Sequence, residues 1–242
     1  MFPTFHSVTF DKKHTWFDWH LVPSSRPLFN PPSLKTHTVD IPGADGVIDE
    51  TESLTGYPTF NNRTGSMEFI VMNGFQEWHE LYTSISNYLH GRRMRIYLDD
   101  DPEWFYEGRV WVDEWRSEKD NSRISISYDV GPYKWRNESV LESDFSPYKN
   151  IAVSSSEKVI QIADTGRAPV CPTLIVSTSD ANGVEVVYTD VDGNVFAYSV
   201  GDGRVEIPQI VFYGEVSGSM QIKCVGENAT GTVTIDYREG SL

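Results

Sequence analysis

Residues 78–101 decide the fold, and they read WHELYTSISNYLHGRRMRIYLDDD. The first half of this stretch has the period of an amphipathic helix, because apolar side chains recur three and four residues apart at Trp78, Leu81, Tyr82, Ile85, Tyr88 and Leu89. We therefore predict a helix over residues 75–90 that packs on a sheet through this one face. Asn73 is expected to cap its first turn, and Gly91 is expected to take the left-handed conformation that follows its last turn.

The second half of the stretch, and the sequence beyond it, alternates as β-strands do. Residues 93–98, 106–115 and 123–130 are the strands predicted here. Between residues 104 and 115 bulky side chains occupy both alternating sets, with one set holding Phe105, Trp111 and Trp115 and the other holding Tyr106, Val110 and Val112. A strand with one wet face would be polar in one of these sets. We therefore expect this strand to be covered on both faces, by the helix and by a second layer, for which a neighbouring subunit is one candidate.

The chain changes character near its middle. Of its 31 aromatic residues, 25 precede residue 151 and 6 follow it, and a polar connector that contains proline lies at the change. We predict an N-terminal β-sandwich domain with one helix over residues 1–136 and a C-terminal domain over residues 137–242. The second domain shows short strands separated by tight turns, which is typical of an antiparallel sandwich or jelly roll. The strands predicted here are residues 158–162, 173–177, 184–189, 195–200, 204–207, 210–213, 219–225 and 232–237. The predicted fold class is mainly β.

Charge and composition exclude several classes of protein. A formal net charge of −15 argues against nucleic-acid binding, which needs clustered Lys and Arg. No apolar run approaches the roughly 18 residues that cross a membrane, so we expect no membrane insertion, and the first residues lack the pattern of an export signal. The two cysteines, Cys171 and Cys224, are expected to remain thiols, with a pairing of the two as the alternative.

No catalytic, cofactor-binding or metal-ligating constellation is recognisable, so we predict no enzyme, no cofactor and no metal site. His79–Glu80 begins like the zinc-protease motif, but Thr83 stands where the second histidine belongs. Residues 190–194 begin like a calcium loop and are better explained as a hairpin turn. The carboxylates of Asp99–Asp101 could bind a cation or serve as a glycosidase pair. We favour a solvated turn that faces Arg92, Arg93 or Arg95.

Several segments resemble a single family of proteins. They are Asp40–Gly46, Asn87–Met94, Ile96–Pro102, Tyr106–Val110, Tyr133–Lys134 and Gly231–Leu242. Together they are similar to the distal tail protein (Dit) family of siphophages, which is common in phages and prophages of Gram-positive bacteria. The similarity spans essentially the whole chain, and its most specific part is the segment from the helix to the acidic turn.

The resemblance implies a structural protein of the virion. Members of the family combine an N-terminal β-sandwich that carries a helix with a C-terminal galectin-like, jelly-roll β-sandwich, and six copies form a ring at the distal end of the phage tail. The ring connects the tail tube protein to the tail-associated lysin or tip protein and, in some phages, to receptor-binding proteins. For this chain the resemblance implies a compact baseplate hub without an inserted sugar-binding module, assembled in the bacterial host cytoplasm.

A ring requires an interface between two different patches of the same protein, and the centres of such interfaces are rich in aromatic residues. We predict that this surface includes Trp104, Phe105, Trp111 and Trp115; the alternative is that they complete the core of their own domain. If DNA passes through the ring, an acidic wall would repel its phosphates, although acidity also serves solubility. The rival function is a carbohydrate-binding adhesin for cell-wall glycans. Residues 137–242 offer it few aromatic platforms: Tyr188, Phe196, Tyr198, Phe212, Tyr213 and Tyr237.

Overall fold

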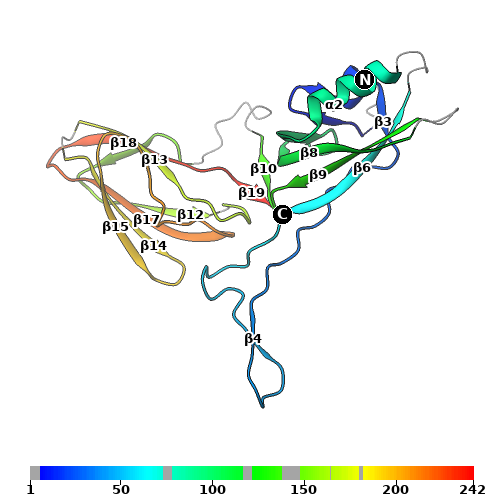
Figure 1. Ribbon diagram of the computed structural model, residues 1–242. Helices are drawn as coiled ribbons and strands as arrows, with labels where there is room; N and C mark the ends of the chain where they lie inside the picture. Colours follow the sequence, from blue (N-terminus) through cyan, green and yellow to red (C-terminus); the bar gives the residue numbers. More distant parts are fainter. Residues whose placement is uncertain (1–5, 73–77, 117–121, 138–147, 164, 180–181) are drawn as a thin grey trace. The chain divides into compact units, whose positions relative to one another are not determined.

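The computed structural model describes residues 6–72, 78–116, 122–137, 148–163, 165–179 and 182–242. Its contacts divide the chain into two compact units, one formed by Met1–Lys134 with Leu242 and the other by Trp135–Ser241. Both units are built from antiparallel strands, and the helices belong to the first (Figure 1). The predicted fold class, mainly β with a helix-bearing N-terminal part and a β-sandwich after it, is confirmed.

The sheet of the N-terminal unit has the strand order β2-β1-β7-β8-β9-β6-β3. The bounds are β1 (Val8–Phe10), β2 (Lys13–His14), β3 (Leu21–Pro23), β6 (Arg63–Val71), β7 (Arg92–Leu98), β8 (Trp104–Arg116) and β9 (Arg123–Val130). Strands β7, β8 and β9 follow one another in the chain and pair as neighbours, which agrees with the three predicted strands. A β-bulge between Val112 and Trp115 shifts the register of β8 against β9.

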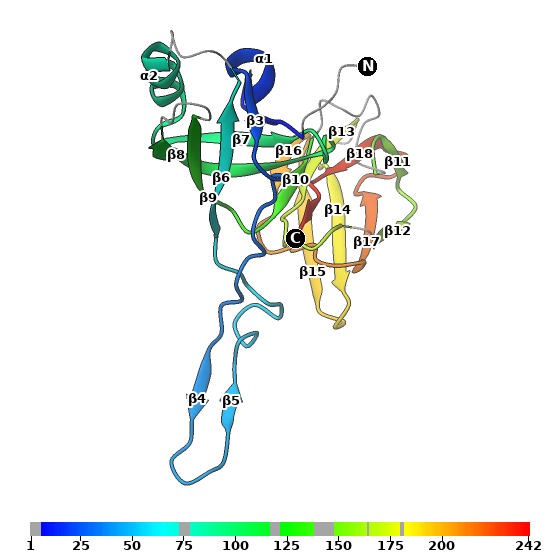
Figure 2. The ribbon, with the colours of Figure 1, turned by 90° about the vertical axis from the view of Figure 1, so that its right-hand side faces the viewer.

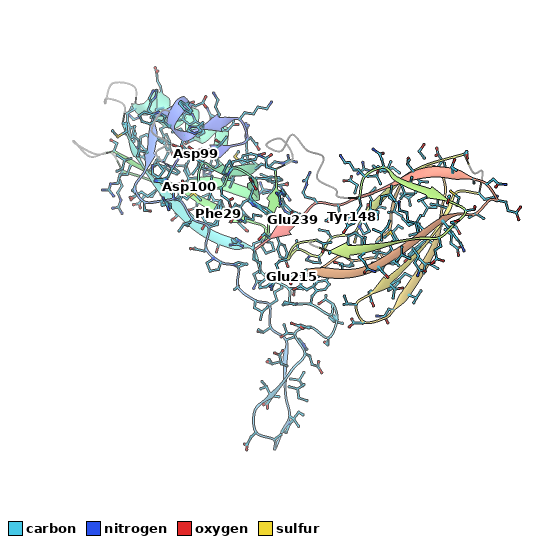
Figure 3. The ribbon with its side chains drawn as sticks, turned by 180° about the vertical axis from the view of Figure 1, so that it is seen from behind. Phe29, Asp99, Asp100, Tyr148, Glu215 and Glu239 are labelled. Carbon is cyan, nitrogen blue, oxygen red and sulfur yellow. The ribbon has the colours of Figure 1, made fainter. Side chains whose placement is uncertain are left out.

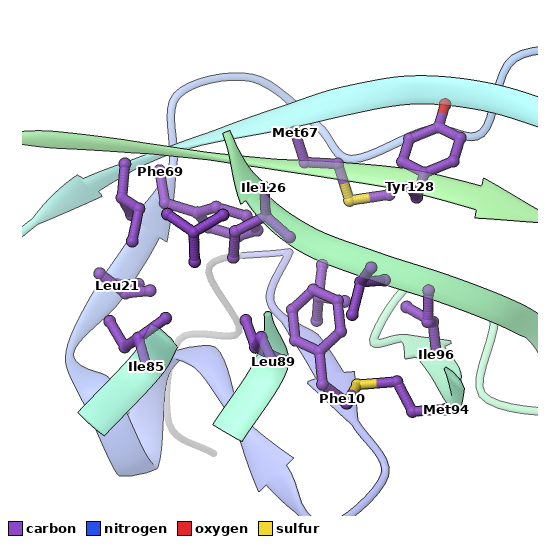
Figure 4. Packing of buried hydrophobic residues seen from close by; sticks show 14 of the residues in the cluster. Phe10, Leu21, Met67, Phe69, Ile85, Leu89, Met94, Ile96, Ile126 and Tyr128 are labelled. Carbon is purple, nitrogen blue, oxygen red and sulfur yellow. The ribbon is translucent and has the colours of Figure 1, made fainter. Parts of the chain in front are cut away.

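One face of this sheet is covered by helix α2 (Trp78–Leu89) and the short helix α1 (Thr15–Trp19). Ile85 and Leu89 of α2 are fully buried against side chains of the strands, as Figure 4 shows. The predicted apolar face of the helix is therefore confirmed. Gly91 has φ = 78°, the left-handed conformation expected there, whereas the predicted N-cap Asn73 lies outside the described residues.

Helix α1 was not predicted, and its start explains why. Its N-cap is His14, whose ring Nδ1 accepts hydrogen bonds from the backbone N–H groups of Trp16 and Phe17. Helix caps are usually Ser, Thr, Asp or Asn, so a histidine in this position is not read as a helix start.

A hairpin interrupts the N-terminal unit between β3 and β6. Its strands are β4 (Thr38–Asp40) and β5 (Val47–Asp49), which pair in antiparallel register. Isolated bridging between Leu34 and Phe60 closes its base. We call residues 35–59 the arm. Figure 2 shows β4 and β5 as a ribbon with no other element of the N-terminal unit beside it.

The C-terminal unit contains two further antiparallel sheets, with strand orders β11-β18-β13-β16 and β12-β17-β14-β15, and a pairing of β10 with β19. The bounds are β10 (Lys134–Arg136), β11 (Ile151–Ser154), β12 (Lys158–Ala163), β13 (Thr173–Thr178), β14 (Val184–Asp190), β15 (Val195–Val200), β16 (Gly203–Glu206), β17 (Val216–Cys224), β18 (Thr230–Asp236) and β19 (Gly240–Ser241). Thr178 Oγ1 of β13 lies 3.8 Å from Cys224 Sγ of β17, which is a contact between the two sheets.

Two local predictions for this unit have opposite outcomes. Residues 190–194 form the expected hairpin turn, in which the Asp190 carboxylate accepts hydrogen bonds from the backbone of Asp192 and Asn194. Residues 210–213, which were predicted as a strand, form only an isolated bridge between Val170 and Phe212. Phe212 is fully buried, so its apolar segment serves the core without joining a ladder. Cys171 and Cys224 are free thiols.

Candidate subunit-interface surfaces

Trp115 lies on the helix side of the sheet, inside its own unit. Its ring stacks on Trp78 with 3.5 Å between centroids and meets Tyr82 edge-on at 4.2 Å. Strict alternation places Trp115 with Phe105 and Trp111, on the other face. The bulge inserts one residue into β8, and an inserted residue exchanges the faces of all that follow. The predicted grouping of these three side chains is therefore wrong for Trp115.

Phe105 and Trp111 point to the face of the sheet opposite the helices. Phe105 is 2% exposed, and part of its cover comes from the Arg95 guanidinium, 4.8 Å from the ring centroid. Trp111 is half-buried and stands opposite Ser127 of β9. Trp104, at the start of β8, lies 5.0 Å from the ammonium group of Lys134. Whether these three residues meet a neighbouring subunit stays a prediction.

The rest of that face is polar and partly charged. Arg93 of β7 and Arg109 of β8 are directly paired and both exposed, while Arg109 is paired with Asp129 of β9. The expectation of cover on both faces of β8 therefore holds around Phe105 and not at Arg109. Because this face is polar, another polar surface can pack against it.

The acidic turn after β7 is a set of ion pairs within the N-terminal unit. Asp99 faces His14 at 3.3 Å, and Asp101 accepts from Lys134 at 2.6 Å. Asp100 is paired with His6 at 2.7 Å and with Arg26 at 3.1 Å, and Figure 3 labels both Asp99 and Asp100. The predicted partners Arg92, Arg93 and Arg95 are wrong: they precede the turn on β7, whereas its actual partners come from distant segments that fold beside it.

The contacts of this acidic turn give it a structural role. Among the described residues, no group of three or more His, Cys, Asp or Glu side chains could hold a metal ion. Each carboxylate already faces a cation or an imidazole, which accounts for the three adjacent acids.

In the described parts of the chain, no helix reaches the length and apolar character that crossing a membrane demands.

The arm presents apolar side chains to solvent. Residues 33–50 are all exposed, and the large apolar side chains among the exposed ones of the arm are Val39, Ile41, Val47, Ile48 and Leu54. In the sequence, only the family resemblance marked the arm tip, Asp40–Gly46, as a feature of interest. Its strands are three residues long, too short for a periodic pattern to stand out.

The aromatic residues of the C-terminal unit do not form a platform. Tyr188 and Phe212 are 1% and 0% exposed. The side chains of Phe196, Tyr198, Tyr213 and Tyr237 are half-buried. A sugar-binding site generally offers an open aromatic face, and none of these six rings is fully exposed.

The fold matches a solved phage structure along nearly its whole length. This is the SPP1 Dit (gp 19.1) protein, described as a paradigm of the hub adsorption apparatus in phages that infect Gram-positive bacteria. The match has a TM-score of 0.60 and 16% sequence identity, and it covers 98% of this chain and 99% of that chain. The chain thus has the two-part β fold of a phage distal tail protein. The resemblance found in the sequence is confirmed at the level of the fold.

Two other solved structures align only weakly with this chain. Two structures of the phage p2 baseplate in its activated conformation, with Sr and with Ca, align with TM-scores of 0.34 and 0.37. Their sequence identities are 7% and 6%, and they cover 93% and 94% of this chain and 90% of each matched chain. No protein-family model matches the sequence, and no curated protein matches it.

Proposed function

We propose that this chain is a structural protein of a phage tail tip. In this proposal six copies form a ring at the distal end of the tail, which connects the tail tube to the tail-associated lysin or tip protein and to the adhesion machinery. The main support is the fold shared with the SPP1 hub protein over 98% of the chain. The protein would reside in the virion after synthesis in the bacterial host cytoplasm, and its role would be structural and not enzymatic.

Residues 1–136 would form the ring, because two extended surfaces that lack cover lie in this part of the chain. One is the face of the sheet that carries Trp111, and the other is the arm. A closed ring needs two different complementary patches on each subunit, and the sheet and the arm of this unit are different in kind. Residues 137–242 would then remain free to contact other tail components.

The rival function, a carbohydrate-binding adhesin, receives less support. The two most buried aromatic rings of the second unit, Tyr188 and Phe212, are part of its core. Screening the full chain on an array of cell-wall glycans tests this function directly. Saturable binding by a protein that stays monomeric would favour the adhesin over the hub.

Light scattering during size-exclusion chromatography, with negative-stain microscopy of the peak, tests the ring. We expect the wild-type protein to form closed rings of six. Trp111→Ala, on the open sheet face, should weaken the ring while leaving the monomer folded. A wild-type protein that remains monomeric at every concentration, also in the presence of the tail components that it is proposed to join, would contradict the proposal.

A further inference from the structure

The arm is a two-faced hairpin that its own unit leaves uncovered. In the β4–β5 register Val39 stands opposite Ile48, while Asp40 stands opposite Val47 and Thr38 opposite Asp49. Successive residues of a strand point to opposite faces. One face of the hairpin is therefore apolar, with Val39 and Ile48, and the other carries the carboxylates.

Such a hairpin needs a partner. An isolated pair of short strands is marginally stable in water, and the arm exposes Val47 by 61% and Leu54 by 97%. Clustered apolar exposure of this kind marks an interaction surface. The arm is also strongly acidic, because residues 35–59 contain five carboxylates and a single lysine. Its partner must therefore combine cations with some apolar surface.

The same chain carries a surface of that chemistry at the start of β7. An open depression of about 610 Å³ is lined by Lys12, Arg92, Arg93 and Arg95, together with Asp11, Tyr88, Met94 and Tyr97. Four cations and one carboxylate meet here in a protein whose formal net charge is −15. Arg92 and Arg93 are exposed; Arg93 also pairs with Glu107 at 3.0 Å. We call this depression the basic edge.

The basic edge is also an open edge of the sheet. Strand β1 pairs with the second half of β7, from Ile96 to Leu98, and its ladder ends where the backbone N–H of Asp11 donates to the carbonyl of Arg95 at 2.8 Å. Because alternate residues of a strand direct their backbone groups to the same side, Arg93 points its N–H and C=O to this side too. Among the described residues, no hydrogen bond joins these two groups to that side. An incoming strand can extend the sheet at such an edge.

The chain turns away from this edge because of a specific local structure. Asp11 has φ = 51°, and its carboxylate accepts the backbone N–H of Arg95 at 2.8 Å. The hydroxyl of Tyr88 donates to the carbonyl of Phe10 at 3.1 Å and accepts from the backbone N–H of Lys12 at 3.3 Å. These contacts stabilise the turn, so the open edge is a defined feature of the folded unit.

We propose that the acidic arm of one copy docks on the basic edge of the next copy. The inference rests on the proposed ring, whose head-to-tail contact it assigns to two named surfaces. Charge complementarity selects the partner, since the arm carboxylates match the guanidinium groups of Arg92 and Arg93. Half-buried Tyr97 supplies apolar surface for the side chains of the arm, and a nucleic-acid backbone has no apolar side chains to place there. A second copy therefore fits the basic edge better than DNA does.

Charge reversal tests the contact. The edge variant is Arg92→Glu with Arg93→Glu, and the arm variant is Asp40→Lys with Asp45→Lys; the hydrogen bonds that hold the Asp11 turn and the Asp49 side chain stay in place. Each variant alone should associate roughly tenfold or more weakly than wild type, because like charges then face each other. Mixed in equal amounts, the two should assemble again as alternating rings, since each reversed surface then meets an opposite one.

The matched control is Lys158→Glu with Arg204→Glu, which changes the net charge as the edge variant does but lies in the C-terminal unit. It should assemble as wild type does. Near-ultraviolet circular dichroism checks that every variant is folded. Rings formed by each reversed variant alone, or a mixture that stays as weak as its components, would overturn the proposed contact while leaving the ring itself intact.

Two further outcomes are decisive. Wild-type protein that never associates would refute the ring and this contact together, which distinguishes that failure from failure of the contact alone. An edge variant that assembles normally but loses binding of a short DNA duplex would assign the basic edge to phosphate and not to a second copy. Restored assembly in the mixture has no such alternative explanation.

Discussion

Trp115 shows how one inserted residue changes the role of a side chain. Its indole lies between Trp78 and Tyr82 of helix α2, and these contacts join the helix to the far end of β8. Because stacked aromatic side chains contribute both buried area and favourable ring geometry, Trp115 belongs to the intramolecular core. Trp111, four residues earlier, lies on the opposite face.

Trp115→Ala should therefore lower the free energy of unfolding by about 2–4 kcal/mol, because it removes a large, partly buried ring. Trp111→Ala should cost less than half as much in the monomer, since that ring stands on the open face. Urea unfolding followed by circular dichroism measures both. Equal losses for the two variants would show that the bulge does not separate their roles.

Tyr188 gives the C-terminal unit a dependence on alkaline pH. Burial, with a smaller contribution from nearby Asp190, raises the pKa of its hydroxyl to about 12, and this hydroxyl donates to the carbonyl of Ser217. The folded state therefore keeps the proton more strongly than the unfolded chain does. The resulting stability is fully present below the ordinary pKa of 10 and is lost as the pH rises towards 12.

We expect up to about 2–3 kcal/mol of stability to be lost across this window, because each unit of pKa shift corresponds to about 1.4 kcal/mol. Burial also raises the pKa of Tyr106 in the other unit, so the comparison must be with Tyr188→Phe. Urea unfolding at several alkaline pH values should show a shallower loss for this variant. The same slope in both proteins would mean that Tyr188 does not control it.

At the scale of elements, helix α2 and strand β7 follow directly from sequence pattern. Ile85 and Leu89 fall on the helical face that the spacing predicts, and both are fully buried. Gly91 then allows the left-handed turn that brings the chain back along the sheet. The pattern was sufficient here because local propensity and burial specify the same structure.

Strand β6 and the arm were not predicted for a different reason. The core side of β6 includes Arg63 and Gly65 as well as Met67 and Phe69, so the apolar alternation is broken. Arg63 is nevertheless buried, because its guanidinium donates to the carbonyls of Pro132 and Asn30. Only the folded structure supplies these acceptors.

Shortening the arm tests whether it belongs to the core of its own unit. The backbone N–H of Glu50 donates to the carbonyl of His37 at 2.8 Å, so residues 38–49 can be replaced by Asn-Gly, a two-residue hairpin turn. The free energy of unfolding of the monomer should change by less than about 0.5 kcal/mol, because the removed side chains are exposed. Self-association should be lost.

Chemical denaturation and light scattering on the same preparation give both readings. A loss of several kcal/mol in the monomer would show instead that the arm packs on its own chain. Unchanged self-association would show that the ring, if it forms, uses other surfaces.

At the scale of the whole molecule, the two units differ in how much of their structure the sequence pattern predicts. In the C-terminal unit the strands are short and their turns conspicuous, so most of them were predicted. Residues 210–213 are the exception, because their apolar side chains fill the core without forming a strand. In the N-terminal unit the candidate interface depends on segments far apart in the chain. The arm and the β7 arginines of the basic edge are separated by more than thirty residues.

The sequence by itself determined the fold class, the amphipathic helix and the strands that follow it, because these depend on spacing along the chain. It also determined the acidity and the concentration of aromatic residues before residue 151. Only the tertiary structure decided which face Trp115 occupies, which cations meet Asp99–Asp101, and that β1 leaves the edge of β7 open at Arg93. These features depend on register and on contacts between distant segments, and local spacing contains no information about either.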